Sequence, residues 1–127
     1  DGGSLIGLSS PGCTPQYKPQ PGYFLPGSGK CIMEYSMRSL ALKYASKNIN
    51  CNVVIPGVTT TEAWDRIGKI RNCSGNDIIT SMSSKISPNG PITSLSVANG
   101  IAFLCSNYGR PITGVSLPID NGVHLKA

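Results

Sequence analysis

The fold is decided by residues 30–57, which read KCIMEYSMRSLALKYASKNINCNVVIPG. Residues 30–47 contain neither Gly nor Pro, and their apolar side chains fall at near-helical intervals. These apolar residues are Ile32, Tyr35, Leu40 and Tyr44. The spacing predicts one long helix. Residues 50–55 follow as a β-rich run that stops at the breaker pair Pro56-Gly57, which predicts a strand.

Elements on both sides of this stretch continue the alternation of strand and helix. Residues 4–8 form a short apolar run that predicts a buried strand, and residues 114–119 predict a last strand. A short helix is expected over 62–70, short helical pieces in a mobile loop over 72–92, and a helix over 93–105. This order predicts an α/β fold with a parallel sheet of about three strands, which is half of a doubly wound domain.

Gly and Pro residues gather in one segment before the long helix. Residues 11–29, PGCTPQYKPQPGYFLPGSG, hold five Pro and four Gly. This composition predicts a long irregular loop. Gly27 and Gly29 precede the helix, but no strand precedes them. We therefore interpret them as loop glycines and not as a phosphate-binding turn.

Length and composition limit the class of protein. The chain has 127 residues, so we treat 1–127 as a single partial domain, and without an initiator Met it is expected to be processed or part of something longer. Its net charge of +5 comes from scattered basic residues, which does not predict nucleic-acid binding. No apolar run approaches the ~20 residues of a membrane span, and no secretion leader begins the chain. Five Cys without a CxxC pair predict reduced, mostly buried thiols in the cytoplasm or another reducing compartment.

Three polar residues suggest chemistry at one edge of the predicted sheet. The first strand delivers Ser10 to its carboxyl end, Tyr23 follows thirteen residues later, and Lys30 opens the long helix. A hydroxyl, a phenol and an ammonium near a strand end can polarise a carbonyl and deliver a proton to it. The same residues also suit a turn serine, a half-buried loop aromatic and a solvated lysine. Their spacing alone leaves both interpretations open.

Motifs that follow one another over about residues 3–122 resemble the short-chain dehydrogenase/reductase family. The motifs are a strand ending in Ser-Ser, then a Tyr and a Lys, an Asn-x-x-x-Pro-Gly strand end leading to a Thr, an Ala-x-x-Phe-Leu-type helix, an Ile-Thr-Gly turn and a final Asp-Gly-Gly. Here they are Ser9-Ser10, Tyr23, Lys30, residues 52–57, residues 59–61, residues 98–104, residues 112–114 and residues 120–122, with Asn121 in place of a Gly. The Tyr-x6-Lys spacing resembles the enoyl-acyl-carrier-protein reductase branch. The commoner Tyr-x-x-x-Lys spacing would need a tyrosine where Pro26 stands.

The resemblance implies the carboxyl-terminal, catalytic half of a Rossmann-like domain in an NAD(P)-dependent oxidoreductase that reduces a carbonyl or enoyl group. Ser10 would orient the substrate, and Tyr23 would be the acid/base, with Tyr17 as the fallback acid. Lys30 would hold the nicotinamide ribose and assist Tyr23. His124 is the only histidine, so neither a His relay nor a His metal site is expected.

The resemblance also implies which residues between 55 and 64 contact the cofactor and the substrate. Ile55, Pro56 and Gly57 would line the nicotinamide, and Thr61 or Thr59 would hydrogen-bond the carboxamide or diphosphate region. These are the contacts that NAD or NADP would make, with no preference between them. Trp64 lies in the expected mobile substrate-loop region, residues 58–92, where it either lines the substrate pocket or simply anchors a short helix.

The resemblance leaves the partners and one alternative function open. The family's Gly-rich nucleotide fingerprint and first strands lie in an amino-terminal half absent here, and family members are roughly twice this length. A homo-oligomer through the long helix, or a missing amino-terminal half, would cover the exposed sheet edge. The alternative is a truncated or divergent member without redox activity, serving as a binding or scaffold subunit or as a cofactor-independent isomerase or cyclase.

Overall fold

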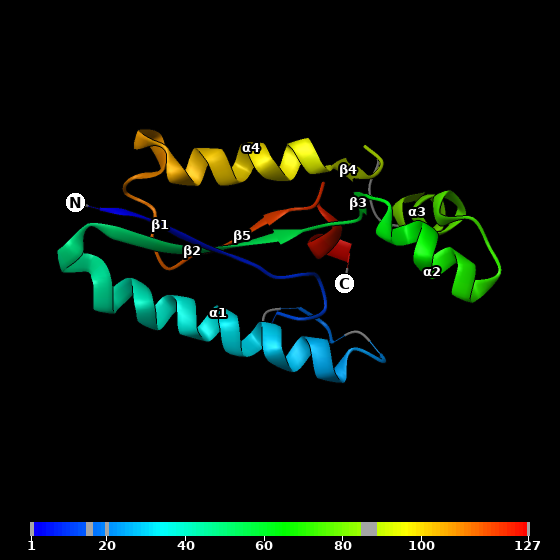
Figure 1. The fold of residues 1–127 in the computed structure, drawn as a ribbon, viewed down its shortest axis with the longest axis horizontal. Coiled ribbons are helices and arrows are strands. Elements are labelled where there is room, and N and C mark those ends of the chain that lie inside the picture. Colours follow the sequence, from blue (N-terminus) through cyan, green and yellow to red (C-terminus); the bar gives the residue numbers. More distant parts are fainter. Residues whose placement is uncertain (1, 15–16, 20, 85–88, 127) are drawn as a thin grey trace.

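The computed structural model describes residues 2–14, 17–19, 21–84 and 89–126. Its centre is a parallel sheet of strands β1 (Gly3–Leu8), β2 (Ile49–Pro56) and β5 (Ser116–Ile119), in the order β1-β2-β5. Helix α1 (Phe24–Tyr44) covers one face of this sheet, and helix α4 (Ser94–Cys105) covers the other (Figure 1). The predicted α/β class with three parallel strands is confirmed.

The strand register brings the ends of β1 and β2 to one edge of the sheet. Leu8 lies opposite Val54, and the amide of Ser9 donates to the Val54 carbonyl over 2.9 Å. On the other side of β2, Pro56 lies opposite Ile119. The sequence expectation that residue 10 and the Pro56-Gly57 turn meet at the same edge is therefore correct.

Helix α1 begins at Phe24 and not at Lys30, and a short 3-10 turn, Ala45–Lys47, follows it. The predicted loop over 11–29 is therefore too long. Pro26 fits because residues in the first turn have no intrahelical acceptor for their N–H. Gly27 is buried, and a side chain there would touch Cys13. Gly27 and Gly29 are thus helical residues and do not form a loop.

The buried face of α1 differs from the apolar spacing in the sequence. Its buried residues are Gly27, Glu34, Met37 and Ala41. Ile32 and Tyr35 are each 67% exposed, and only Leu40 and Tyr44 of the expected apolar set pack against the core. The apolar spacing indicated a helix correctly but did not identify the face that it buries.

Strand β2 contributes to both hydrophobic cores. Cys51, Val53 and Ile55 point toward α1, where they meet Met37 and Ala41. Val54 points the other way, into a cluster with Ile92, Val97 and Leu104 beneath α4. A strand buried on both faces reads as a continuous apolar run, which is the pattern of residues 53–55.

The described parts of 59–93, residues 59–84 and 89–93, contain a helical hairpin and two short strands. Helices α2 (Ala63–Arg71) and α3 (Gly75–Ser84) pack together, and β3 (Thr59–Thr60) pairs in parallel with β4 (Ile92–Thr93). The short helical pieces were expected, whereas the β3–β4 pair was not, because two residues carry no periodic signal. Two further 3-10 turns, Asn107–Gly109 and Val123–Lys126, flank β5.

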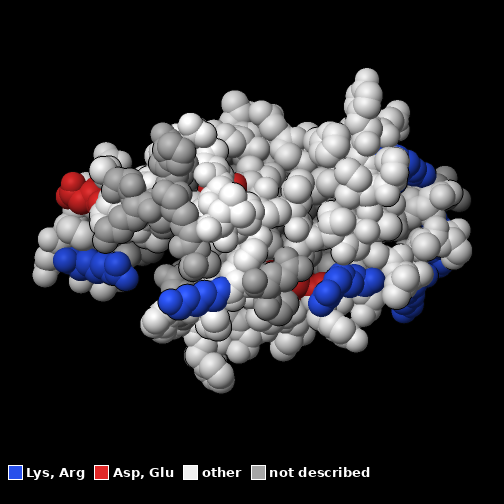
Figure 2. All heavy atoms as spheres, turned by 180° about the vertical axis from the view of Figure 1, so that it is seen from behind, with Lys and Arg blue, Asp and Glu red and all other residues white. Residues whose placement is uncertain are grey.

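The basic residues are scattered over the surface as the sequence predicts, but the cysteines are less buried than it predicts. On the face shown in Figure 2, Lys and Arg side chains lie in separate places and form no single patch. All five cysteines are free, but Cys73 and Cys105 are exposed, so the thiols are not mostly buried. Among the described residues, no helix combines the length and apolar character that crossing a membrane requires.

Candidate functional site

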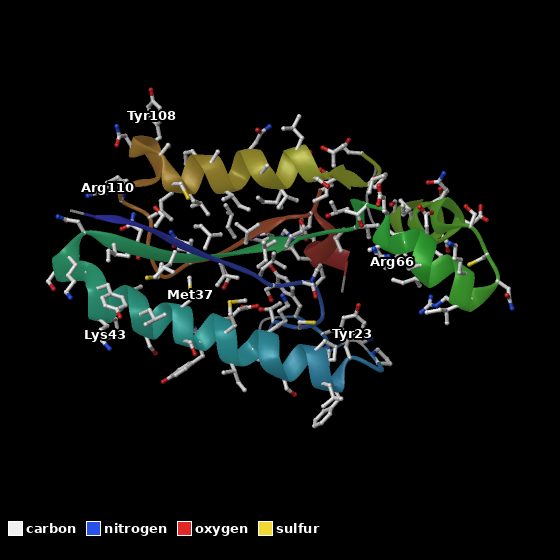
Figure 3. The ribbon with its side chains drawn as sticks, in the orientation of Figure 1. Tyr23, Met37, Lys43, Arg66, Tyr108 and Arg110 are labelled. Carbon is white, nitrogen blue, oxygen red and sulfur yellow. The ribbon has the colours of Figure 1, made fainter. Side chains whose placement is uncertain are left out.

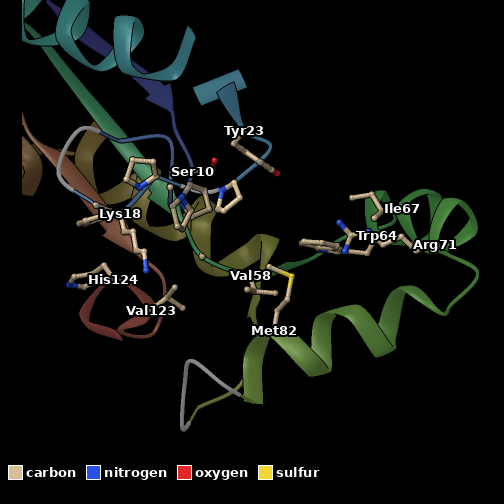
Figure 4. A pocket seen from close by; sticks show the side chains of 17 residues that line it. Ser10, Lys18, Tyr23, Val58, Trp64, Ile67, Arg71, Met82, Val123 and His124 are labelled. Atoms are coloured by element: carbon tan, nitrogen blue, oxygen red, sulfur yellow. The ribbon is translucent and has the colours of Figure 1, made fainter. Parts of the chain in front are cut away.

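A pocket of about 490 Å³ opens at the carboxyl ends of β1 and β2. Its walls come from the loop after β1, the residue before α1, the end of β2, the α2–α3 hairpin and the 3-10 turn after β5 (Figure 4). The carboxyl edge of a parallel sheet is where open α/β folds bind their ligands. The pocket is therefore the candidate functional site.

The structure brings five of the nine predicted site residues to this pocket. They are Ser10, Tyr23, Pro56, Gly57 and Trp64. The other four, Lys30, Ile55, Thr59 and Thr61, are not among the described residues that line it. The pocket thus contains both the predicted carbonyl-orienting hydroxyl and the predicted acid.

The two serines after β1 face different surroundings. Ser9 is buried and donates its hydroxyl to Glu34. Ser10 is half-buried on the pocket side, and its Oγ lies 3.1 Å from Cys13 Sγ. Of these two serines, Ser10 is therefore the one whose hydroxyl faces the pocket.

Tyr23 and Lys30 lie at different places along the start of α1. Tyr23 is the last residue before the helix, its carbonyl accepts the amide of Gly27 over 2.7 Å, and its side chain is 40% exposed beside the pocket. Lys30 lies further along the helix and donates its Nζ to the Leu8 carbonyl at the end of β1. This contact holds the ammonium at the strand edge, in a neighbouring hollow that Met33 also lines.

A buried carboxylate that the sequence analysis missed holds this region together. Glu34 on α1 is 2% exposed and accepts hydrogen bonds from the hydroxyls of Ser9, Thr14 (3.0 Å) and Ser116 (3.1 Å). These donors come from the end of β1, the following loop and β5. A lone glutamate on a helix usually faces solvent, but this one lies three residues before Met37, on the stripe that α1 buries.

A second buried carboxylate lies behind the opposite wall. Asp120 accepts the amides of Gly122 (3.0 Å) and His124 (2.9 Å), and His124 Nδ1 lies 2.9 Å from it. The His124 ring stacks on Tyr17 with centroids 5.7 Å apart. Burial raises the pKa of the Tyr17 phenol, and the negative charges of Asp120 and Glu34 raise it further. The phenol of Tyr17, the fallback acid of the sequence analysis, is therefore held in its neutral form.

The end of β2 and the hairpin meet beneath the pocket. Ile55 is fully buried in the core against α1, so only its main chain is available to a ligand. The hydroxyl of Thr59 donates to the Gly57 carbonyl over 3.0 Å, and the Thr59 carbonyl accepts the indole N–H of Trp64 over 2.8 Å. Trp64 thus lines this pocket, and its indole N–H ties the start of α2 to Thr59.

Comparison with known proteins identifies the family. A family model described as enoyl-(acyl carrier protein) reductase matches residues 1–124. The chain belongs to the short-chain dehydrogenase/reductase family. Among curated members, it is 32% identical to the enoyl-[acyl-carrier-protein] reductase [NADH] of Aquifex aeolicus over 97% of this chain and 43% of that protein. It is 30% identical to the 1-cyclohexenylcarbonyl-CoA reductase of Streptomyces collinus over 100% of this chain and 43% of that protein.

Solved structures of short-chain dehydrogenases/reductases show the same fold. The aldohexose dehydrogenase of Thermoplasma acidophilum superposes with a TM-score of 0.82 at 24% identity, covering 98% of this chain and 49% of that one. A blue fluorescent protein from a metagenomic library, solved with NADPH, gives 0.80 at 25% identity, with coverage of 97% and 46%. The chain therefore has the Rossmann-type fold of the family and spans less than half the length of the curated relatives it matches.

Proposed function

We propose that the chain is the catalytic half of an NAD(P)-dependent oxidoreductase that reduces a carbonyl or enoyl group in the pocket at the end of β1. The observation that supports this most strongly is the meeting of Ser10 and Tyr23 in one largely apolar pocket, against the Pro56-Gly57 end of β2. An apolar pocket with a few placed polar groups is the usual form of a small-molecule site. The names of the curated relatives point to the same chemistry.

The proposed mechanism uses the hydroxyl and the phenol of the pocket in sequence. Ser10 donates a hydrogen bond to the substrate oxygen and orients it, while Tyr23 delivers the proton. Nicotinamide, when bound, supplies the hydride. The hydrogen bond from Ser10 polarises the carbonyl, and the half-exposed phenol of Tyr23 regains its proton from water. Lys30 offers its remaining ammonium N–H groups to ribose hydroxyls at the strand edge.

The residues at the end of β2 fit a nicotinamide ring. Pro56 and Gly57 line the pocket, where the pyrrolidine ring of Pro56 offers an apolar surface to an aromatic group. Gly57 is needed for packing, because a Cβ there would lie 2.7 Å from the Cα of Asp120. The hydroxyl of Thr59 already donates to Gly57, whereas no hydrogen bond from the exposed Thr61 hydroxyl occurs among the described residues. We therefore assign the polar contact to the carboxamide or diphosphate region to Thr61, in preference to Thr59.

We further propose that the α2–α3 hairpin within residues 58–92 is the substrate-covering region and that the protein works in the cytoplasm or another reducing compartment. Trp64 and Ile67 of α2 and Met82 of α3 turn apolar side chains to the pocket. Five free cysteines, two of them exposed, suit a compartment in which thiols stay reduced.

We also propose a homo-oligomer formed through the outer face of α1, which carries five exposed large apolar side chains. They are Phe24, Leu25, Ile32, Tyr35 and Leu42. Ile32→Glu places a charge within this apolar surface and is expected to shift the full chain toward monomer in sedimentation velocity. Ala98→Glu, at an exposed position of α4, is the matched control. Unchanged assembly of the Ile32 variant would refute this interface.

One observation favours the alternative of a member without redox activity. Lys30 lies outside the pocket, and Pro26 occupies the position where the commoner family spacing has its tyrosine. A cofactor-independent isomerase or a binding subunit would keep the pocket and have no need of Lys30. The two functions therefore differ in whether nicotinamide is consumed.

The proposed function is tested by the oxidation of NADH or NADPH by the full chain, followed at 340 nm with ketones and enones. We expect turnover with at least one cofactor. Ser10→Ala should lower kcat by about 10²-fold, because the oriented hydrogen bond to the developing oxyanion is lost. Ser28→Ala, whose hydroxyl bonds only to the Phe24 carbonyl on the exposed side of α1, is the control. Substrate conversion without cofactor oxidation would favour the isomerase.

A further inference from the structure

The ionisable side chains with a basic group among the described residues that line the candidate pocket are one lysine, one arginine and one histidine. Its lining contains Lys18, Arg71 and His124, and no carboxylate occurs among the described residues that line it. The remaining wall is largely apolar, with Val58, Ile67 and Met82 among its members. An electropositive, apolar pocket favours a ligand that combines an apolar body with a negative charge.

The basic groups divide between two ends of the pocket. Figure 4 shows Lys18 and His124 together on one side and Arg71 with Trp64 and Ile67 on the other. In this view Ser10 and Tyr23 lie between the two ends. A substrate whose reacting group meets Ser10 and Tyr23 would therefore have a basic residue of the pocket lining on either side of it.

Among the described residues that line the pocket, Lys18 is a cation that lies neither in an ion pair nor at the end of a helix. Among the described residues, its ammonium takes part in no ion pair, since the one salt bridge joins His124 and Asp120. That pairing neutralises any charge on His124. Arg71 lies in the last turn of α2, where the carbonyl end of the helix already attracts its charge.

Both sequence neighbours of Lys18 also line the pocket. Tyr17 stacks on the His124 ring with an interplanar angle of 21°, and Pro19 also lines the pocket. Asp120, the nearest carboxylate behind His124, is 5% exposed and does not line the pocket. Lys18 thus lines the pocket together with both of its neighbours, whereas Asp120 does not line it.

We propose that the pocket takes an apolar ketone or enone that carries a carboxylate, and that Lys18 binds this carboxylate. The ketone or enone part of this substrate class rests on the proposed function, whereas the carboxylate part rests on the charge of the pocket. A charge-assisted hydrogen bond from Lys18 at the pocket edge gives a selectivity of about tenfold over a neutral analogue.

The test compares 7-oxooctanoate with its methyl ester in binding to the full chain. Binding is followed by calorimetry and by the fluorescence of Trp64, the only tryptophan of the 127 residues, which lines the pocket. We expect the acid to bind about tenfold more tightly than the ester. Lys18→Met should abolish this preference and leave the affinity for the ester unchanged. Lys43→Met, at the far end of α1 (Figure 3), is the matched control and should keep the preference.

Three results would overturn the proposal. The first is equal binding of acid and ester by the wild-type chain, or binding of neither. The second is a preference that survives Lys18→Met or that disappears instead in Arg71→Met. The third is an equal loss of affinity for nicotinamide mononucleotide in Lys18→Met, because Lys18 would then serve a cofactor phosphate. If the chain prefers the acid over the ester through Lys18 but has no reductase activity, the proposed function is refuted and the carboxylate site still stands.

Discussion

Replacing Glu34 by alanine is expected to lower the free energy of unfolding by about 3 kcal/mol, because buried hydroxyl donors then lose their acceptor. The donors from Ser9 and Thr14 are buried, and the one from Ser116 is half-buried, so little water reaches them. Urea denaturation of the full chain measures this loss. The same change should loosen the end of β1 that carries Ser10.

Two further variants separate the buried cluster from a general effect of losing a glutamate. Glu34→Gln keeps the shape and one acceptor oxygen, so we expect a smaller loss of about 1 kcal/mol. Glu62→Ala removes an exposed glutamate at the start of α2 that makes no side-chain capping bond, and should be nearly neutral. If Glu34→Gln and Glu62→Ala unfold at the same denaturant concentration as the wild-type chain, the cluster does not stabilise the site region. If Glu34→Ala does not fold, the free energy of unfolding of Glu34→Gln still tests the role of the buried carboxylate.

Replacing Tyr23 by phenylalanine is expected to lower kcat for reduction by about 10²–10⁴-fold, the usual contribution of a positioned general acid. The variant removes one hydroxyl from a half-exposed ring at the pocket, so the fold and substrate binding should not change. Steady-state kinetics should show the loss in kcat, with KM within a few-fold of the wild-type value.

Tyr17→Phe is the matched control, since Tyr17 also lines the pocket. Burial and the charges of Asp120 and Glu34 raise the pKa of its phenol, which makes it a weaker proton donor. We expect kcat to change by no more than a few-fold. A large loss of kcat in Tyr17→Phe, with near-normal kcat in Tyr23→Phe, would show that Tyr17 and not Tyr23 is the acid.

Much of the fold could be predicted because local patterns of apolar residues and of Gly and Pro indicate the strands and helices. The apolar run 53–55 ends at Pro56-Gly57, and this pattern alone indicates a strand buried on both faces, as the structure has it. The left-handed backbone at Asn121 (φ 52°) likewise agrees with the residue that stands there in place of glycine. Periodicity and breakers carry this information without any tertiary contact.

Features that depend on tertiary contacts were missed or misplaced. The start of α1 was set too late because Pro26, Gly27 and Gly29 look like loop residues, although the first turn tolerates Pro and Gly27 packs against Cys13. Glu34 was overlooked because a charged residue is rarely buried without partners, and its partners are as far away in sequence as Ser116.

The candidate site could be predicted where its residues follow directly from the ends of strands. Ser10 and Pro56-Gly57 sit directly at strand ends, so sequence order is enough to bring them together at one edge. The position of Lys30 depends on where α1 begins and on its bond to the Leu8 carbonyl, neither of which the sequence reveals. His124 and Lys18 reach the pocket from loops, where spacing carries no geometric information.

We propose that the Ser10–Tyr23 pocket performs hydride transfer with a proton from the chain, and an isotope-transfer experiment distinguishes this chemistry from a reaction without cofactor. The full chain is incubated with a ketone or enone and NADH or NADPH carrying deuterium at both C4 positions, and the product is analysed by mass spectrometry. We predict one deuterium in each product molecule from the wild-type chain, and at least a hundredfold less labelled product from Tyr23→Phe with cofactor binding unchanged. Product without deuterium, or equal labelled product from both proteins, would contradict the claim.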